Sequence, residues 1–401
     1  MSGNALIVSR YFPPGGGVGA FRSAKFVKYL AKYGWDSYVV SLPQERQKQF
    51  VPDNVNENQF ASLAEIPEKR IYIDVPITSV SESLGDTRRL PILAKRVPEL
   101  VEEYNIDVVY QTAPPFYSLP AVAWVKRKTE VPYVIDFRDP WYLNDDIFTS
   151  IKSVNNPVWR WINARAERLV IKRADKIILN TSMMEKLYST TYPEYEDTFT
   201  TITNGFDPDD YTADPVANQD PELLQLIYPG RFREGTTGLL HAIQSASEAN
   251  KIRLLHFGVM NRTHTQSFYD QASRMGLRDQ IENRGYAKFP TVVSNIKGSD
   301  VGLVVTRRND PTHVPAKTYD YIACNLPILA VCGADSALAQ ILEPFEHAYI
   351  AAHDDVDQLS DQLTFLAKNK PNQLDSGETV ELYSRSELTR QLSVVFEEVQ
   401  T

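Results

Sequence analysis

Short apolar runs alternate along most of the chain with stretches whose apolar residues recur every three or four positions. In the first half we expect strands at 5–9, 37–41, 108–111, 133–136 and 176–180, and helices at 20–33, 98–104, 121–129 and 156–174. In the second half we expect strands at 226–228, 253–257, 301–305 and 328–331, and helices at 237–248, 266–275, 292–297, 316–324, 334–342 and 356–368. This alternation predicts an α/β protein with two Rossmann-like, doubly wound parallel sheets and right-handed crossovers.

A stretch rich in Asp and Pro, 207–222, separates the two halves, and we place a linker there. We therefore expect an N-terminal domain at 1–206, a C-terminal domain at 207–375, and a final segment, 376–401, whose helix packs back on the first domain. The polar stretch 46–58 is expected to be a mobile loop. Two doubly wound domains would leave a cleft between them, and ligands of such sheets bind at the carboxyl ends of the strands.

The composition narrows the class of protein without naming its chemistry. The chain has 401 residues, 43% of them hydrophobic and 23% charged, and no apolar run long enough to span a membrane. A net charge of −9 argues against a nucleic-acid partner. The N-terminus lacks the basic start of a signal peptide, and two cysteines without a disulfide framework favour a reducing cytoplasm.

The expected helix 156–174 allows a second location. It carries Trp159 and Trp161 together with five lysines and arginines. Such a helix can lie at a membrane interface, which would give peripheral contact with the inner face of the membrane. It can equally be an amphipathic helix that covers the sheet, and the sequence leaves both interpretations open.

The segment 312–331 indicates a ligand. Pro315 fits the first position of a helix, while Val314 before it has no side-chain oxygen with which to cap the helix. The N–H groups that follow Val314, including those of Ala316 and Lys317, are then expected to be free donors at a positive helix end, which suits a phosphate. Asp320 adds a carboxylate one turn later, so the pattern predicts a nucleotide ligand.

A glycine-rich loop joins the first expected strand to the first helix. Gly15, Gly17 and Ala20 have the spacing of a dinucleotide fingerprint. We reject that interpretation because two prolines lengthen the turn and the second strand ends without the acidic residue that would hold a ribose. Gly17 and Gly19 are expected to let the backbone approach a ligand, and a merely flexible loop is the alternative.

Charged residues follow two of the expected strands directly. The strand 133–136 ends at Asp136, and Arg138 and Asp139 follow it directly. Charged residues at the carboxyl end of such a strand are good site candidates. The alternative is an Arg138–Asp139 structural pair with Asp136 capping a turn. Arg231 and Arg233 follow the strand 226–228, and a guanidinium can hold phosphate oxygens in bidentate fashion. Two solvated arginines are the alternative there.

Two further observations concern binding. Tyr286, in the loop 285–290, could stack on a base or offer its backbone to one, and a core tyrosine is the alternative. Asp207 and Asp209 have the spacing of a metal-binding pair but lie in the expected linker, and the six histidines show no metal-ligand spacing. We therefore expect no metal site.

Taken in order, these motifs resemble the retaining glycosyltransferases of family four, which have the GT-B fold. The resemblance spans nearly the whole chain and depends on six segments: the glycine-rich loop with AFRSAKFVKYLAKYGW, DFRDPW, ADKIILNTS, TITNGFD, GRF and PAKTYDYIACNLPILAV. It implies that the second domain binds a nucleotide sugar and that the first faces the acceptor. It also implies that neither a metal nor another cofactor is required, because basic side chains and a helix N-terminus stabilise the leaving diphosphate.

The resemblance also implies roles for single residues. Arg231 would hold the diphosphate, with Arg233 in place of the usual lysine. Asp320 would bind the ribose hydroxyls, and Thr312 stands where relatives carry the glutamate that meets the donor sugar. Arg138 stands where many relatives have histidine, and Asp139 matches the acidic residue beside it.

The function that we expect is metal-independent transfer of a hexosyl or related group, with retention, in polysaccharide or glycolipid biosynthesis. The donor would be a UDP- or GDP-sugar, and the acceptor a glycan, a lipid-linked glycan or a small molecule. A sugar-nucleotide epimerase of the same fold and a non-catalytic nucleotide-sugar-binding protein are the alternatives.

Overall fold

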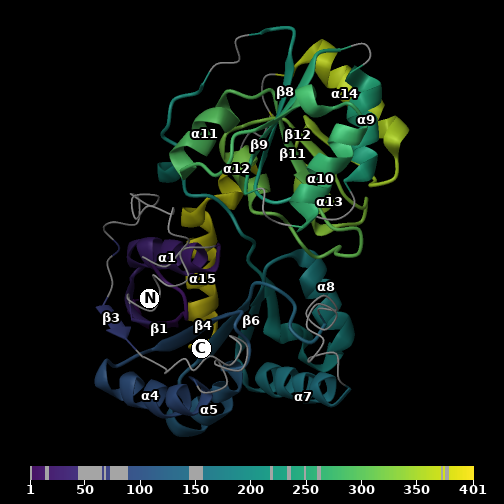
Figure 1. Ribbon diagram of the computed structural model, residues 1–401. Coiled ribbons are helices and arrows are strands. Elements are labelled where there is room, and N and C mark those ends of the chain that lie inside the picture. The colour runs from purple at the N-terminus through teal and green to yellow at the C-terminus, as the bar shows by residue number, and fades with distance from the viewer. Residues whose placement is uncertain are drawn as a thin grey trace. The chain divides into compact units, whose positions relative to one another are not determined.

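The computed structural model describes residues 2–13, 18–43, 66, 69–72, 89–143, 157–216, 220–232, 236–247, 250–259, 263–371, 374 and 379–401. The chain divides into two compact units (Figure 1). Unit 1 contains Met1–Asn204 and Arg385–Thr401, and unit 2 contains Gly205–Ser384. The expected loop 46–58 and the residues Gly15, Gly17 and Arg233 lie outside the described residues.

Unit 1 is built on one parallel sheet. Its strands are β1 (Gly3–Val8), β2 (Trp35–Ser41), β3 (Lys69–Tyr72), β4 (Val108–Ala113), β5 (Tyr133–Phe137), β6 (Lys176–Leu179) and β7 (Phe199–Thr201). They pair in the order β3-β2-β1-β4-β5-β6-β7. The change of direction beside β1 is the point at which open α/β sheets bind ligands.

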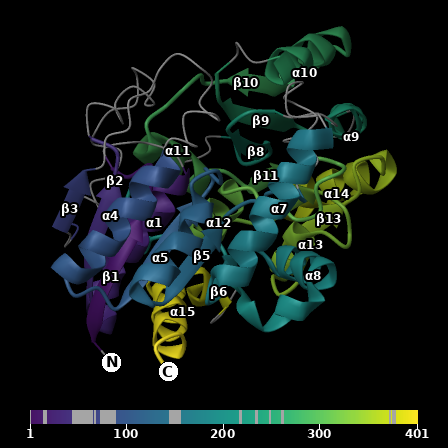
Figure 2. The same cartoon turned by 90° about the horizontal axis from the view of Figure 1, so that it is seen from below.

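Helices cover both faces of this sheet. They are α1 (Val18–Leu30), α4 (Arg89–Glu103), α5 (Val122–Thr129), α7 (Pro157–Arg173), α8 (Ser182–Thr191) and α15 (Arg385–Glu398). Alternate residues of β1 enter different cores: Leu6 packs with α4, α5, α7 and α8, while Ile7 packs with α1 and α15. Figure 2 shows α4, α5 and α7 side by side on their face of the sheet. The C-terminal helix is thus part of unit 1.

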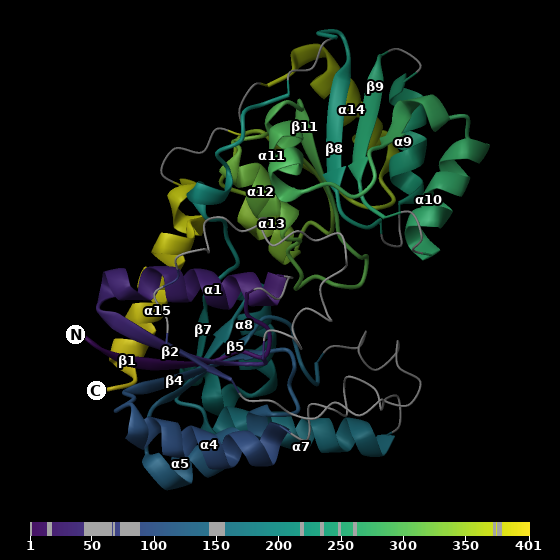
Figure 3. The same ribbon diagram turned by 60° about the vertical axis from the view of Figure 1, so that its left-hand side comes forward.

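Unit 2 repeats the plan with six strands. They are β8 (Leu224–Pro229), β9 (Ile252–Phe257), β10 (Ile281–Asn283), β11 (Val301–Val305), β12 (Ile328–Val331) and β13 (Ala348–Ala351), paired in the order β10-β9-β8-β11-β12-β13. The helices are α9 (Thr237–Ser247), α10 (Thr263–Arg274), α11 (Phe289–Lys297), α12 (Lys317–Ala323), α13 (Ala337–Leu342) and α14 (Val356–Asn369). Figure 3 shows α11 and α12 on one side of this sheet and α9 and α10 on the other. The predicted fold class is confirmed.

The structure corrects several predicted elements. The strands β3, β7, β10 and β13 were not predicted, because each has only three or four residues and lies toward a sheet edge. Nor was α8 predicted. The helix predicted at 98–104 begins instead at Arg89 and continues through Pro98, since Leu93, Val97 and Leu100 form one continuous buried stripe.

The prediction that residues 207–222 form a linker is also corrected for the part up to Val216. Lys297 donates a hydrogen bond from Nζ to the carbonyl of Tyr211, and Ser294 donates one to the carbonyl of Asp214. The N–H of Val216 donates in turn to the carbonyl of Ser294. Residues 207–216 are therefore fastened to α11 of unit 2, because side chains and backbone of that helix satisfy their polar groups.

Candidate functional site

Two glycines let the ends of β8 and β9 come close together in unit 2. Gly230, directly after β8, has a φ of +112°, which a residue with a side chain rarely adopts. Its N–H donates to the carbonyl of Phe257 at 2.7 Å. A Cβ on Gly258 would lie 2.5 Å from the carbonyl oxygen of Gly230, so only glycine fits there. The carboxyl ends of β8 and β9 thus form one tight backbone surface.

His256 forms a hydrogen bond with the backbone of this surface. It is fully buried, and its Nε2 lies 2.7 Å from the carbonyl oxygen of Gly230. Because a carbonyl can only accept, Nε2 carries the proton and Nδ1 accepts from the Tyr269 hydroxyl at 2.8 Å. Burial lowers the pKa of His256 to about 4, and the nearby charge of Lys317 acts in the same direction. The imidazole is therefore neutral at physiological pH.

Lys317 places a positive charge at the same strand end. It is the first residue of α12, and its Nζ lies 3.1 Å from the centroid of the Tyr228 ring. A Cβ built on Gly230 would lie 3.5 Å from this ammonium. Arg231, exposed, follows Gly230 directly. Folding thus brings Lys317, which is distant in sequence, beside the segment that carries Arg231.

The start of α12 differs from the prediction. The helix begins at Lys317, and Val314 before it is buried. The N–H of Thr318 donates to the carbonyl of Pro315, and the N–H of Tyr319 donates to that of Ala316. Fewer donors are free than we expected, because Ala316 already has helical dihedral angles and closes a tight first turn. The hydroxyl of Thr312 donates to Oδ1 of Asp310 at 3.1 Å.

Asp320 has a partner that the sequence did not indicate. The hydroxyl of Tyr211 donates to Oδ1 of Asp320 at 2.5 Å. Burial raises the pKa of Asp320 to about 6, while the Tyr211 hydrogen bond and the charge of Lys317 oppose this rise. Tyr211 lies in the segment expected to be a linker, where its aromatic ring among Asp and Pro residues was the one available signal.

Tyr286 is not a core residue. It follows β10 in a loop, where the N–H of Gly285 donates to the side chain of Asn283 at 2.7 Å. Its side chain is 42% exposed, so the alternative of a core tyrosine is wrong. That this ring stacks on a base stays a prediction.

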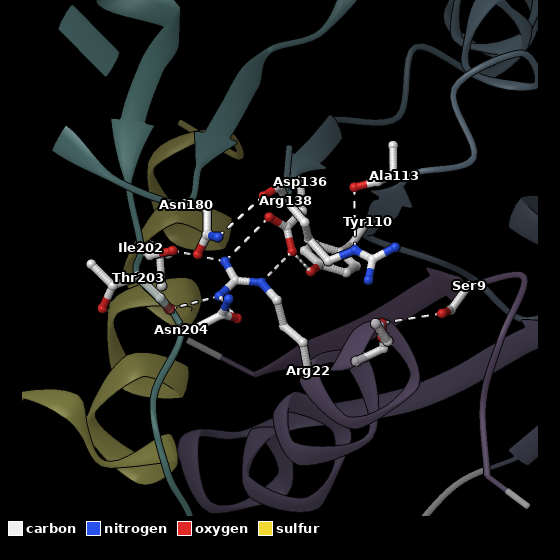
Figure 4. A network of polar contacts seen from close by, with 12 residues as sticks. Ser9, Arg22, Tyr110, Ala113, Asp136, Arg138, Asn180, Ile202, Thr203 and Asn204 are labelled. Carbon is white, nitrogen blue, oxygen red and sulfur yellow. Dashed lines mark hydrogen bonds and ion pairs between the residues drawn. The ribbon is translucent and has the colours of Figure 1, made fainter. Parts of the chain in front are cut away.

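In unit 1, Asp136 belongs to a buried network that the sequence did not predict (Figure 4). Arg22, on α1, is fully buried and forms two hydrogen bonds to the carboxylate of Asp136, from Nε at 2.7 Å and from Nη2 at 3.2 Å. Arg22 also donates to the carbonyls of Ile202 and Thr203, and the hydroxyl of Tyr110 donates to Asp136. Asp136 therefore joins α1 to the sheet and does not cap a turn.

Backbone carbonyls accept hydrogen bonds from the guanidinium of Arg138. It donates from Nε to the carbonyl of Ala113 at 3.2 Å and from Nη2 to that of Pro114 at 2.5 Å. A Cβ on Gly19 would fall within 1.7 Å of its Nη1, so Gly19 provides the room for this guanidinium. Burial lowers the pKa of Arg138, whereas the charge of Asp139 favours its protonated form. Gly19, Arg138 and Asp139 thus lie together at the carboxyl end of β5.

The described residues contain no group of three or more His, Cys, Asp or Glu side chains placed to hold a metal ion. Asp207 accepts a hydrogen bond from the N–H of Asp209 at 3.2 Å and caps a short helical turn. None of the described helices is both long enough and apolar enough to cross a membrane.

Comparisons with known proteins agree with this architecture. Residues 20–210 match the model of Glycosyltransferase Family 4. A comparison with curated protein sequences gave no match.

Among solved structures, sucrose-phosphate synthase from Thermosynechococcus elongatus is similar, with a TM-score of 0.72, 15% identity, and 99% of each chain covered. A glycosyltransferase from Rickettsia africae has a TM-score of 0.67 at 14% identity, covering 99% of this chain and 98% of its own. HepE from Anabaena, solved in complex with UDP, has a TM-score of 0.68 at 14% identity, covering 99% of this chain and 100% of its own. The chain has the GT-B fold of these glycosyltransferases, and residues 20–210 carry the sequence pattern of glycosyltransferase family four.

Proposed function

We propose that this protein is a glycosyltransferase that moves a hexosyl or related group from a nucleotide sugar to an acceptor, with retention at the anomeric carbon. The observation that carries the proposal is the position of Lys317, whose ammonium lies beside Gly230 at the end of β8, next in the chain to Arg231. Two cations at the carboxyl end of a central strand suit a diphosphate.

These residues have distinct tasks in the proposed reaction. Departure of the nucleoside diphosphate builds negative charge on its oxygens, and Arg231 and Lys317 offset that charge as it develops. The carboxylate of Asp320, held by Tyr211, accepts hydrogen bonds from the ribose hydroxyls. Tyr286 stacks on the base. The acceptor oxygen attacks the anomeric carbon from the side of the leaving group, so no protein nucleophile is needed. Asp139 in unit 1 orients the acceptor or takes its proton.

The donor class has support from one of the similar structures. HepE has been solved with UDP and with UDP-glucose. We therefore propose UDP-sugars as the first donors to test, with GDP-sugars next. A lipid-linked or polysaccharide acceptor and a place at the inner face of the membrane complete the proposal.

The experiment has a binding arm and a turnover arm. A ligand that binds only the folded protein raises its melting temperature, so UDP-, GDP- and ADP-sugars are compared by thermal shift. Free nucleotide is then measured with and without candidate acceptors. Release that requires the acceptor supports a transferase, whereas release without it, or isomerisation of the donor sugar, contradicts the proposal.

A matched pair of variants tests the phosphate role. Arg231→Ala is expected to lower turnover by about 10²–10³-fold with little change in stability, because a donor to the developing charge is lost. Arg278→Ala is the control, since Arg278 is exposed and precedes β10 at the opposite, amino end of the strands. Wild-type turnover in Arg231→Ala would refute the phosphate role. A wild-type protein that no nucleotide sugar stabilises would refute the whole proposal.

A further inference from the structure

Unit 1 exposes an unusual number of large apolar side chains on two neighbouring helices. Of the 13 large hydrophobic residues that are exposed in the described chain, six lie on α5 and α7. They include three of the protein's five tryptophans: Trp124 is 58% exposed, Trp159 37% and Trp161 58%. The other two, Trp35 and Trp141, are buried. Exposed tryptophan is therefore confined, within the described residues, to these two helices.

These exposed residues of α7 are not the ones that hold the helix to the sheet. The buried residues of α7 are Asn163, Glu167, Val170 and Ile171, which recur at three- and four-residue spacing. Val158, Trp161, Ile162 and Leu169 lie on the opposite side of the helix. The helix thus has one face that packs on unit 1 and a second face that carries exposed apolar side chains.

The same two helices are strongly basic. They carry eight lysines and arginines but only one acidic residue, the buried Glu167, in a chain whose net charge is −9. The carboxylate of Glu167 accepts hydrogen bonds from Tyr188 and Tyr192 inside the unit, so it does not neutralise the surface.

An open pocket joins the two helices. It has a volume of ≈ 570 Å³, and its lining includes Trp124, Lys126 and Arg127 from α5 and Lys172 and Arg173 from α7. Lys126 is paired with Asp175 at 2.8 Å. In the described part of the chain, Arg127, Lys172 and Arg173 have no ion-pair partner. The pocket therefore presents unneutralised cations beside an exposed tryptophan.

Cations at the last turn of a helix also offset the helix dipole, and that effect alone could account for Lys172 and Arg173. It does not account for the tryptophans, nor for Arg165, which lies mid-helix with its guanidinium 5.1 Å from the Trp161 ring. Interleaved tryptophans and arginines instead match the boundary of a bilayer, where indole rings sit at the level of the head groups and cations meet lipid phosphates.

We propose that this surface binds an anionic lipid bilayer. We call it the α5–α7 face and define it by Trp124, Arg127, Val158, Trp161, Ile162, Arg165, Leu169, Lys172 and Arg173. The tryptophans and aliphatic side chains enter the interfacial region, and the cations lie on lipid phosphates. The α5–α7 face would give the proposed membrane location a defined surface, and lipid binding there does not depend on sugar transfer.

Flotation of the full-length protein with vesicles tests the proposal. Vesicles of phosphatidylcholine alone are compared with vesicles that also contain phosphatidylglycerol, without nucleotide sugar or acceptor. The protein is expected to float with the anionic vesicles and to be released by salt, which screens the charges. Failure to float, or equal flotation with both vesicles, would overturn the proposal and leave the glycosyltransferase assignment untouched.

Matched variants assign the binding to the α5–α7 face. Each cation near an anionic surface strengthens binding by about fivefold, so Trp161→Ala with Lys172→Glu is expected to weaken binding more than tenfold. The control is Phe365→Ala with Lys368→Glu on α14, where Phe365 is 48% exposed and Lys368 is exposed. Arg127→Glu with Arg173→Glu tests the pocket separately, and thermal melts check that each variant folds.

Two outcomes of this comparison would count against the proposal. If the variants of the α5–α7 face bind like the wild type, or if the α14 control loses as much binding, the surface is not the one we name. Sedimentation without vesicles tests a second copy as the occupant. A wild-type dimer that Trp161→Ala with Lys172→Glu dissociates would show that this face binds another protein chain.

Discussion

At the scale of single residues, Asp320 is a carboxyl group whose surroundings oppose its charge. Burial raises its pKa from 3.8 to about 6, although Tyr211 donates a hydrogen bond to it. A carboxylate that is costly to keep charged in the free protein is well placed to accept hydrogen bonds from a ligand. The surroundings of Asp320 therefore lower the stability of the free protein and at the same time favour binding of the ligand.

We expect Asp320→Asn to be more stable than the wild type at neutral pH and weaker in binding nucleotide sugar. Between pH 3.8 and about 6 the folded wild type binds more protons than the unfolded chain, so its stability falls as pH rises through this range. The variant has no carboxyl group to titrate at this position. Above pH 6 its free energy of unfolding should therefore exceed that of the wild type by about 1–3 kcal/mol. Urea unfolding at several pH values measures the difference, which should vanish below the unfolded pKa.

Tyr211→Phe is the matched control for this prediction. It leaves the carboxylate in place but removes its donor, so the variant should lose about 1–3 kcal/mol at neutral pH. Identical pH profiles for wild type and Asp320→Asn would mean that the carboxyl group has an ordinary pKa, contrary to what its burial requires.

At the scale of elements, α15 shows how one segment is recruited by a distant sheet. Phe396 is fully buried, and its ring packs edge-on against Trp35 at 5.1 Å and against Tyr110 at 6.3 Å between centroids. Leu388 and Leu392 enter the same core. The last helix therefore completes the hydrophobic core on the α1 side of the first sheet.

Phe396→Ala is expected to lower the free energy of unfolding of unit 1 by about 3–5 kcal/mol, because a large buried ring is lost and a cavity remains. Val394→Ala, on the same helix but 39% exposed, should change it by less than about 0.5 kcal/mol. Denaturant unfolding followed by tryptophan fluorescence measures both, since Trp35 touches the deleted ring. Equal effects of the two substitutions would contradict the packing of α15 on this core.

The elements also show where prediction from the sequence ends. The central strands β1, β4, β5, β8, β11 and β12 follow from their continuous apolar runs, because both faces of a central strand are buried. The edge strands β3 and β10 could not be predicted, since a short strand takes most of its stability from its neighbour. The prediction of a helix at 98–104 missed the first nine residues of α4, because proline disfavours a helix that continues through it, whereas the buried stripe of α4 stabilises this one.

At the scale of the whole molecule, the chain consists of two units with separate hydrophobic cores. Every residue that we assign to the donor and that the structure describes, apart from Gly19, belongs to unit 2. A nucleotide sugar should therefore stabilise unit 2 first, whatever the acceptor does in unit 1.

Hydrogen exchange tests this division. Adding the UDP-sugar that gives the largest thermal shift should slow amide exchange in peptides from β8 and α12, because the ligand binds folded unit 2 and opposes its local opening. Peptides from β1 and β5 in unit 1 serve as the internal control and should change less. Arg231→Ala should reduce the protection of unit 2. Slower exchange confined to unit 1 would mean that the donor binds unit 1, which would contradict the assignment of the donor site to unit 2.

The sequence by itself determined the fold class, the two halves and the segments that carry the candidate site. These features depend on the local periodicity of apolar residues and on glycine, proline and charged residues at the ends of strands. Such signals lie within short stretches of the chain, so they can be identified without the tertiary structure. Only the tertiary structure decided that Tyr211 donates to Asp320, that Arg22 pairs with Asp136, that Lys317 lies beside Gly230 and that Gly19 makes room for Arg138. Each of these pairs joins positions far apart in the chain, and no local pattern specifies which distant polar group a buried charge will meet.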